Sequence, residues 1–585
     1  VNAGRLKLGN AQLFGTNSPS VTVASGATLD LNGQTVANTN AISLTGTGAA
    51  SAGGVLINTS TNAASYAGLV TLAGDSTINA SSGNITLSNT GTMSSTTTKV
   101  LTVDGSANTT INENTTTLRF VKNGTGTLTL NGGNTNSYST QANVYAAMIN
   151  NGTVKVGHTQ AFGSAGSGGF GINNSTIPGN AILVSGGTLD MNGIAYNKNT
   201  FTVLSGTGYS SQGAVINSNA TDASMQAMWM LNGSTSINAN AGGLSITNSS
   251  SNYRTLNNRG YNLTLGGTGT SANNTLNTAV FGSGNLIKEG TGTWTLLPNA
   301  VASAYYLDTT DGLTYSLGTT GSTSAMNYLT GSISVNAGRL KLGNNGALGL
   351  SSGMTVAQGA TVDLNGRTLI NATNLTITGT GAAGAGGAIV NDSTQAASYI
   401  GLVTLAGDST INATTGNITL SNIGTITGSG RNLTVDGAST TTIASIIGTD
   451  NGGITKNGTG TLILSGANTF TGNIAVNAGR LQLNNAGAIG SSSSPSVTVA
   501  SGATFDLNGI TASNSNNLTI SGTGAAGYGA ALINQSVAAT YSGNITLADN
   551  ATINATGGNI SLSGVISGNY NLEVAGGSAT RWTRF

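Results

Sequence analysis

The chain is organised around one stretch, Lys456-Asn-Gly-Thr-Gly-Thr-Leu-Ile-Leu464, which continues through a glycine- and asparagine-rich segment to Val476-Asn-Ala-Gly-Arg-Leu-Gln-Leu483. Apolar and polar residues largely alternate in Thr461–Leu464 and Arg480–Leu483, which predicts two short strands with one buried face each. The glycine and asparagine residues around them favour tight turns, and no helix of ordinary length fits between those turns. The stretch therefore predicts a repeat unit built of short strands and turns.

The composition of the 585-residue chain sets strong bounds on its class. Only 6% of the residues are charged and only 4 are proline, whereas 89 are glycine, which is unusual for a compact globular protein. The 38% of apolar residues can bury a continuous thin core, which a disordered polar tract cannot. The net charge of +1 offers no basic footprint for nucleic acid, and the absence of cysteine excludes disulfides and thiolate metal sites. We therefore expect an all-β repeat protein with no nucleic-acid partner.

The first residues of the sequence already belong to the repeat. Val1–Leu8 is nearly identical to Val335–Leu342, and no secretion signal precedes it. The sequence contains no run of about 18 apolar residues, so we expect no membrane-spanning segment in this piece. These features favour an internal piece of a longer precursor.

A long period is superimposed on the short one. The phrase Thr28–Gly33 recurs as Thr188–Gly193, Thr361–Gly366 and Thr504–Gly509. An opening segment also recurs, as Val1–Leu8, Ile149–Val156, Val335–Leu342 and Val476–Leu483, and it divides the chain into four blocks, 1–148, 149–334, 335–475 and 476–585, of which the last is cut short. Block two also carries a tyrosine-rich insertion at about 298–330.

Short strands that recur at close spacing within one chain predict a β-solenoid. A single coil cannot bury its apolar face alone, but stacked coils close a continuous core. With roughly 20 residues per coil, the chain would form about 29 coils in an elongated rod. Propellers would need longer strands and stronger aromatic signatures in each blade.

The repeat resembles the autotransporter-associated β-strand repeat of bacterial passenger domains. The resemblance is closest over Ile454–Leu483, good over Val121–Asn134 and recognisable over Leu286–Leu296. It implies a right-handed parallel β-helix that is exported and displayed outside a Gram-negative cell. It implies no catalytic residue, because the family motif is structural.

Few residues suggest chemistry. The single histidine, His158, falls where the other blocks have asparagine, which favours a turn role over a catalytic or metal-binding one. A carboxylate recurs once per block, too far apart for the paired acid and base of a polysaccharide-cleaving enzyme. These residues are Asp30, Asp190, Asp363 and Asp506, and we expect each to point outward from a strand and to bond to the next turn. The sequence thus predicts no catalytic residue, no metal site and no cofactor.

A second acidic position varies between blocks. Asp75 and Asp408 match each other, whereas block two has Ser234 there and block four has Asn550, which favours a turn-capping role. The threonine rows of the Gly-Thr-Gly-Thr runs suggest an ice-binding face, but their alternation is broken from coil to coil, so solvent-side strand positions explain them better.

Block two departs most from the repetition. Its insertion contains Tyr305, Tyr306, Tyr315 and Tyr328, which form our candidate contact surface because tyrosine combines apolar area with a hydrogen-bonding tip. The other interpretation is a loop folded over its own coil. Block two also has Met225-Gln-Ala-Met-Trp-Met230 where the other blocks have a recurring phrase around Tyr66, Tyr399 and Tyr541. The larger side chains predict a local swelling of the core or a second covered patch, of which the core is the favoured account.

The favoured function is structural: an extracellular stalk, filament subunit or adhesin on the outer surface of a Gram-negative bacterium. Candidate partners are a cell surface, a polysaccharide or extracellular matrix. Because neither end of the sequence reads as a polar cap, we also expect end-to-end self-association. The alternative is a carbohydrate-active enzyme on a β-helix scaffold, which convergent acidic groups from adjacent coils would favour.

Overall fold

The structure is a computed structural model that describes residues 1–12, 14–15, 20–95, 97–135, 145–163, 181–248, 255–269, 271–299, 305–308, 313–316, 325–490, 495–512 and 514–582. The chain forms two compact units, which are treated separately below. Unit 1 contains residues 1–286 and 292–325, and unit 2 contains residues 287–291 and 326–585. The four-block division of the sequence stays a prediction.

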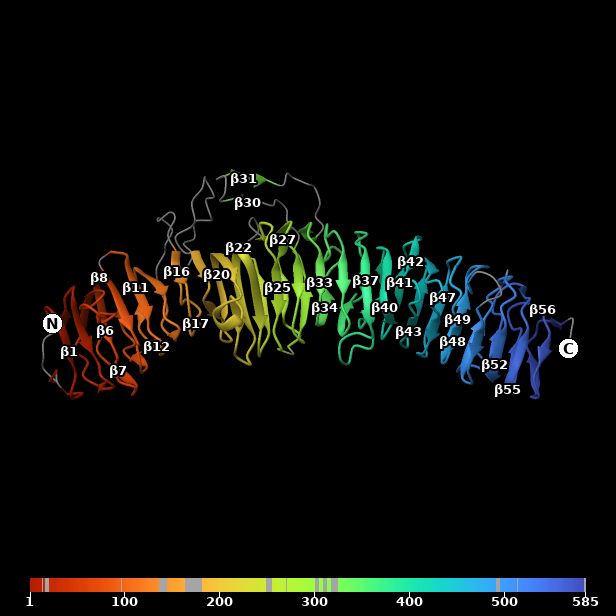
Figure 1. Cartoon of the computed structure of the whole chain (residues 1–585), viewed down its shortest axis with the longest axis horizontal. Coiled ribbons are helices and arrows are strands. Elements are labelled where there is room, and N and C mark those ends of the chain that lie inside the picture. The colour runs from red at the N-terminus through yellow and green to blue at the C-terminus, as the bar shows by residue number, and fades with distance from the viewer. Residues whose placement is uncertain are drawn as a thin grey trace. The chain divides into compact units, whose positions relative to one another are not determined.

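Unit 2 is a stack of parallel strands, coloured green to blue in Figure 1. One column of strands consists of β34 (Gly338–Leu342), β36 (Ala360–Asp363), β38 (Ile389–Val390), the end of β40 (Val403–Asn412), β43 (Leu433–Asp436), β46 (Ile454–Lys456) and β48 (Ile474–Val476). Leu340 lies opposite Val362, and Val362 lies opposite Ile389. These coils therefore contain 22 and 27 residues, the differences between the paired residue numbers.

Unit 1 repeats the same arrangement, from red to yellow in Figure 1. Its corresponding column begins with β1 (Gly4–Lys7), β3 (Ala27–Asp30), β6 (Leu56–Ile57), β8 (Val70–Asn79) and β11 (Lys99–Asp104). Among the residues described, the only helix is the 3-10 turn η1 (Tyr209–Ser211). The expected all-β solenoid is confirmed.

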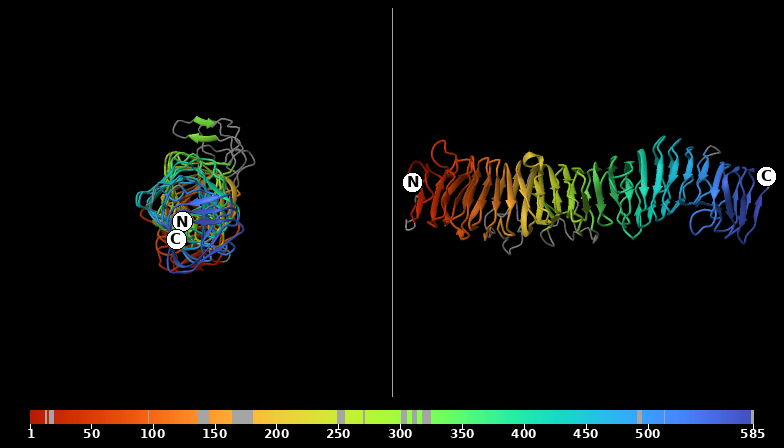
Figure 2. Two further views of the ribbon diagram at one scale, coloured as in Figure 1. Left: turned by 90° about the vertical axis from the view of Figure 1, so that its right-hand side faces the viewer. Right: turned by 90° about the horizontal axis from the view of Figure 1, so that it is seen from below.

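The expected number of coils is wrong. The described chain forms about 22 turns instead of about 29. Coils carry more residues than the roughly 20 assumed, because the turns between strands vary in length while the strands remain short. The second view in Figure 2 shows these turns projecting from the edges of the stacked strands.

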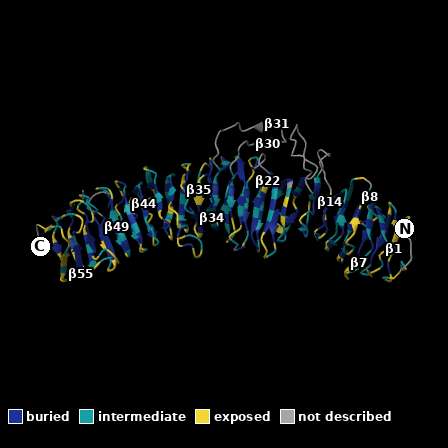
Figure 3. Ribbon diagram, turned by 180° about the vertical axis from the view of Figure 1, so that it is seen from behind, coloured by how far each residue is buried: buried dark blue, intermediate teal, exposed yellow. Residues whose placement is uncertain are grey.

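The alternation read from the sequence places the core correctly. In β47 (Thr461–Leu464) and β49 (Gly479–Leu483), the side chains of Leu462, Leu464 and Leu481 are fully buried, and the residues between them are half-buried. Figure 3 shows this pattern of buried residues along the strands of both units. Buried tyrosines add volume to the core, and their hydroxyls donate to backbone carbonyl oxygens. Tyr66, Tyr399 and Tyr541 donate to the carbonyl oxygens of Asn40, Thr373 and Asn516 at 2.7, 2.6 and 2.8 Å.

Candidate contact surface

The tyrosine-rich insertion of block two contains an antiparallel hairpin, unlike the parallel coils. Its strands are β30 (Tyr305–Asp308) and β31 (Leu313–Ser316). Tyr306 lies opposite Tyr315 in the register, while Tyr305 lies opposite Ser316. Figures 1 and 2 show both strands outside the stacked coils of unit 1.

Tyr328 lies elsewhere, in β32 (Tyr328–Leu329) of unit 2, where its side chain is half-buried. The preceding residue identifies this segment as an ordinary coil. The Asn327 side chain donates to the Ala347 carbonyl at 2.6 Å, and in block three Asn468 donates to Ala488 at the same distance. The coil therefore resumes at Asn327, earlier than the expected insertion boundary, and three of the four candidate tyrosines belong to the hairpin.

Block two also has an apolar row on the outward side of a sheet. The strands that carry it are β18 (Ala181–Ser185), β20 (Ala195–Gly206) and β22 (Ala223–Ala239). Leu183 pairs with Val203, and Val203 pairs with Met230. Phe201 pairs with Met228 two residues earlier. We call Ala181, Phe201, Val203, Met228 and Met230 the outer cluster; they pack together, with Tyr145 and Leu183 at the margin.

The same outward positions are polar in the other blocks. They hold threonine or serine, exposed or half-buried: Thr22, Ser43 and Thr71 in block one, Thr355, Thr376 and Thr404 in block three, and Thr498, Thr519 and Thr546 in block four. The members of the outer cluster are instead at most 5% exposed. The core side of β22 holds Met225 and Trp229. Met225 and Trp229 thus lie in the core, while Met228 and Met230 form a second buried patch; that the core swells at this place stays a prediction.

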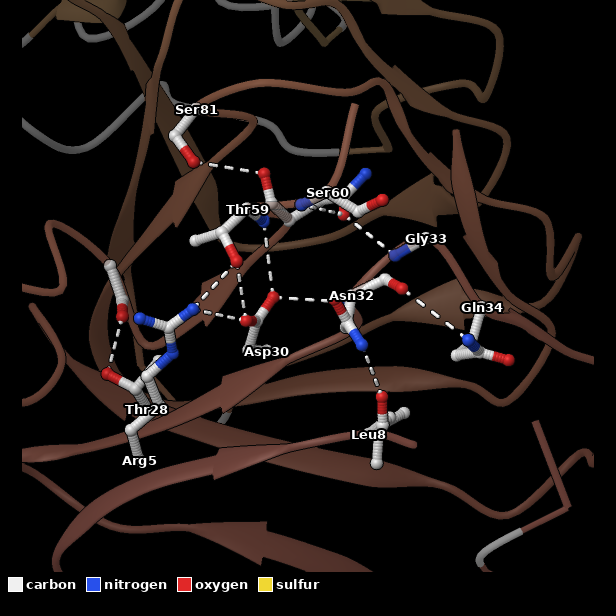
Figure 4. A network of polar contacts seen from close by, with 12 residues as sticks. Arg5, Leu8, Thr28, Asp30, Asn32, Gly33, Gln34, Thr59, Ser60 and Ser81 are labelled. Atoms are coloured by element: carbon white, nitrogen blue, oxygen red, sulfur yellow. Dashed lines mark hydrogen bonds and ion pairs between the residues drawn. The ribbon is translucent and has the colours of Figure 1, made fainter. Parts of the chain in front are cut away.

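The recurring aspartates tie neighbouring coils together. Asp30 accepts from the backbone N–H groups of Asn32 and Thr59 at 3.0 and 3.2 Å and from the Thr59 hydroxyl at 2.7 Å (Figure 4). Arg5, one coil earlier, forms an ion pair with the same carboxylate. Burial alone would raise the pKa of Asp30, but the hydrogen bonds from Arg5, Thr59 and Asn32 outweigh it and lower that pKa. The expected bond to the next turn is confirmed, although the carboxylate is fully buried and not solvent-facing.

The arginine that forms an ion pair with this aspartate was not predicted from the sequence. Arg480 pairs with Asp506 and Arg339 with Asp363, each one coil apart, as Arg5 pairs with Asp30. Block two has Thr153 in place of the arginine, and there Asp190 accepts from the Ser218 hydroxyl at 2.5 Å. The signal available in the sequence was the recurrence of arginine about one coil before the aspartate in the same three blocks.

One pair of carboxylates does lie on adjacent coils. Arg339 contacts both Asp363, at 3.0 Å, and Asp392, so the guanidinium bridges the two. The Asp363 side chain is 1% exposed, which leaves it no access to a substrate. In the described part of the chain, no group of three or more His, Cys, Asp or Glu residues could hold a metal ion. This geometry serves coil-to-coil contact better than acid-base chemistry.

The second acidic position caps turns, as expected. The carboxylates of Asp75 and Asp408 accept the backbone N–H groups of Val100 and Asn432, both at 2.9 Å. Asn550 does the same for Asn571 at 2.9 Å in block four. In block two the Ser234 hydroxyl accepts the N–H of Asn262 at 3.4 Å. Three chemically different side chains, at four positions, thus perform one structural task.

His158 is also a turn residue. Its Nδ1 accepts the backbone N–H of Gln160 at 3.1 Å. In the other blocks the side-chain oxygens of Asn10, Asn344 and Asn485 accept the equivalent N–H at 2.9 to 3.1 Å. The interchange of histidine with asparagine therefore reflects a shared acceptor, and the turn prediction is confirmed.

Three buried lysines distinguish the opening stretch and its sibling copies. Lys122, Lys288 and Lys456 are at most 1% exposed. The Lys288 ammonium donates to the carbonyl oxygens of Glu289, Gly290 and Ala337 at 2.5, 2.7 and 3.1 Å. Burial lowers the pKa of each lysine to about 8, against the opposing effect of a nearby carboxylate. The lysine thus closes the glycine turn that follows it.

One buried acid has no counterpart in the other blocks. Glu113 is 1% exposed and accepts the backbone N–H of Val70 at 2.9 Å, 43 residues away in sequence. Burial raises its pKa to about 8, which the hydrogen bond from Val70 opposes. Block three has Ser445 at this place, which donates to the Asn422 carbonyl at 2.5 Å instead. Glu113 therefore completes the backbone pairing of its coil.

The stacked parallel coils, with their polar side chains committed to neighbouring coils, define a non-globular β-solenoid repeat protein. The Passenger-associated-transport-repeat family matches residues 120–156 and 454–483. An adhesin, the BmaC autotransporter of Brucella suis biovar 1 (strain 1330), is 36% identical over 157 residues. Together with the fold, these similarities support an autotransporter passenger with a β-helix.

The extent of these similarities is limited. The aligned part covers 26% of this chain and 4% of the Brucella adhesin. No solved structure matches the chain. Within the described ranges, no helix is long and apolar enough to cross a membrane.

Proposed function

We propose that the chain is a non-catalytic segment of a surface adhesin, displayed outside a Gram-negative cell. The observation that carries the proposal is the similarity to an autotransporter adhesin together with the passenger-associated repeats. The commitment of the recurring aspartates and lysines to coil-to-coil contacts supports a scaffold role for the repeat. In this proposal the coils form a stalk, and the segments that do not follow the repeat make the specific contacts.

The hairpin of block two is the proposed contact surface. Tyr305, Tyr306 and Tyr315 fall within eight described residues, and tyrosine is enriched where proteins bind one another. The low charge of the chain argues against a partner held by long-range electrostatic attraction. The proposed partners are a cell surface, a polysaccharide or extracellular matrix.

An adhesion assay tests this proposal. Cells displaying the chain are compared with cells displaying the triple variant Tyr305→Ser, Tyr306→Ser and Tyr315→Ser, on host cells, matrix proteins and immobilised polysaccharides. The variant should lose binding to the surface that the original chain recognises. The matched control is Tyr261→Ser together with Tyr570→Ser, because these tyrosines are 40% and 49% exposed on coils outside the hairpin. Equal adhesion of the triple variant and the original chain would refute the hairpin as contact surface.

End-to-end association is a further part of the proposal. The last described coils, β57 (Ile566–Ser567), β58 (Leu572–Ala575) and β59 (Thr580–Trp582), border a hollow. Val574 and Trp582 beside it are 41% and 40% exposed, in contrast to the buried residues of inner coils. Stacking of a second copy on these coils would cover them. A strictly monomeric chain at high concentration in light scattering and electron micrographs would refute stacking of copies.

A further inference from the structure

The Asn–Gly pair that ends the recurring aspartate phrase is held by hydrogen bonds in every block. Asparagine before glycine loses its side-chain amide readily, because the glycine nitrogen approaches the asparagine Cγ without hindrance from a Cβ. In block two, the Asn192 side chain donates to the Val156 carbonyl at 3.0 Å, and the Gly193 N–H donates to the Asn217 side chain at 2.9 Å. The leaving amide and the attacking nitrogen are thus both bound to neighbouring coils. The same two bonds hold the pairs at residues 32–33, 365–366 and 508–509.

The pair Asn232–Gly233 in β22 lacks these bonds. β22 pairs with β20 at Leu231 and again at Thr235. Among the described strands, residues 232–234 have no paired residue on the next coil either, so they form an excursion from the ladder. Asn232 is exposed, and its Nδ2 donates no hydrogen bond within the described part of the chain. Its side-chain nitrogen can therefore leave without breaking a contact.

The guanidinium of Arg259 contacts the side-chain carbonyl of Asn232. The Arg259 Nη1 donates to the Asn232 Oδ1 at 3.3 Å from the next coil, where Asn257 pairs with Met230. A cation at this oxygen draws electrons from Cγ and stabilises the negative charge that an attack on Cγ places on the oxygen. The contact thus prepares the amide of Asn232 for attack by the nitrogen that follows it.

The equivalent excursions of the other blocks already contain a carboxylate. They are residues 73–75, 406–408 and 548–550, and they carry Asp75, Asp408 and Asp549. Block two has Asn232-Gly-Ser234 instead, with no acid. An excursion of this kind therefore accommodates a charged side chain. Because it stands outside the ladder, it also tolerates the extra backbone atom of an iso-aspartate, which would break the register of a paired strand.

We propose that Asn232 is a site of spontaneous deamidation, which converts it into a carboxylate paired with Arg259. The Gly233 nitrogen loses its proton to water and forms a bond with Cγ of Asn232, and Nδ2 leaves as ammonia. Water then opens the resulting cyclic imide at either carbonyl, which restores the Gly233 N–H and yields aspartate or iso-aspartate. No oxidant or reductant takes part. The added negative charge lowers the formal net charge of +1 to zero.

Peptide mass spectrometry of the folded, unaltered chain tests the proposal. The chain is incubated at mildly alkaline pH and sampled for conversion of asparagine into aspartate and iso-aspartate. Asn232 should convert about 30-fold faster than Asn192, because opening the turn at Asn192 breaks two hydrogen bonds that Asn232 lacks. Asn192 is the matched control, since it also precedes glycine in block two, and after unfolding in urea the two should convert at similar rates. Equal rates in the folded chain, or an Asn232 that stays an amide, would overturn the proposal.

The products and one variant test the route. Iso-aspartate should appear at residue 232, because only the cyclic imide yields it, and conversion to aspartate alone would overturn the role of Gly233. Arg259→Gln keeps a hydrogen-bond donor but removes the cation, so conversion of Asn232 should slow roughly fivefold. Unchanged or faster conversion would overturn the role of Arg259.

Blocking the attacking nitrogen gives a further test. A Cβ at Gly233 would lie 2.4 Å from the Ser205 Oγ, so Gly233→Ala is combined with Ser205→Ala, and Ser205→Ala alone is the control. The double variant should convert about tenfold more slowly than its control, because the Cβ hinders the approach of the nitrogen. Equal rates would overturn the proposal. None of these readouts involves adhesion, so the deamidation goes beyond the adhesin proposal and fails or holds independently of it.

Discussion

Asp506→Asn tests how much the arginine–aspartate ion pair stabilises the contact between neighbouring coils. The Asp506 side chain is fully buried, pairs with Arg480 and accepts the backbone N–H of Asn508 at 2.8 Å. Asparagine keeps the shape but removes the charge, and the Arg480 side chain is only 14% exposed. Removing one partner of a buried pair costs about 3–5 kcal/mol. We expect about 3 kcal/mol, the lower end, because Arg480 keeps a cation-π contact with Tyr528, 5.0 Å from the ring centroid.

Hydrogen exchange measured by mass spectrometry is the suitable assay, because each coil of a solenoid depends mainly on its neighbours and the loss should stay local. A loss of about 3 kcal/mol corresponds to roughly 150-fold faster exchange in β49 and in β51 (Ala503–Asp506). Remote strands of unit 2 should exchange at unchanged rates. Adding Arg480→Met to the Asp506→Asn background should restore part of the protection, because no unpaired charge then remains.

Block two supplies the matched control. Asp190→Asn alters the same position where Thr153 replaces the arginine, so only neutral donors lose a charged acceptor. The expected cost there is about 1.5 kcal/mol, or roughly 13-fold faster exchange near Asp190. Equal acceleration in the two variants would refute the reasoning, because it would mean that the arginine contributes nothing specific.

Three further predictions concern single coils. Stability should rise by about 1.6 kcal/mol per buried lysine between pH 8 and pH 9.5, because the unfolded lysine, with its pKa of 10.5, still binds a proton that the folded one progressively loses above about 8. Urea unfolding across this range should show a smaller rise for Lys456→Met, and an identical rise would contradict the buried ammonium. Asp408→Asn should preserve the turn, whereas Asp408→Ala should cost about 1 kcal/mol, seen as faster exchange near Asn432. His158→Asn should change the free energy of unfolding by less than about 0.5 kcal/mol, and a larger loss would show a role beyond the turn.

The strands and their buried faces could be predicted because apolar residues at every second position show which side of a strand faces the core. Turn-capping at Asp75 and Asp408 was also predictable, because the sibling blocks replace them with other short hydrogen-bonding side chains. The number of coils was not predictable, because strand patterns do not determine how many residues each turn contains. Coil length depends on which strands pair, and that information lies in the register.

Two features required the structure. Met228–Leu231 is a continuous apolar run, and in Phe201–Leu204 only Thr202 is polar, so the register is needed to show that Val203 and Met230 lie on the outward side. The buried lysines escaped notice because lysine is rarely buried and is normally taken as a surface residue. The available signal was the position of Lys456, which lies two residues after Ile454 and therefore on the same face of β46.

The central claim is that the repeats are coils of a parallel β-solenoid in a fixed register, and cysteine cross-linking tests it most directly, because the chain has no cysteine of its own. Thr434 lies opposite Thr455 on the next coil. Their Cα atoms should be about 4.8 Å apart, within the range that a disulfide bridges. The account predicts that Thr434→Cys with Thr455→Cys forms an intramolecular disulfide under mild oxidation, whereas Thr434→Cys with Asn457→Cys, about 8 Å apart, does not. Efficient cross-linking of the second pair and not the first would contradict the register and the fold built on it.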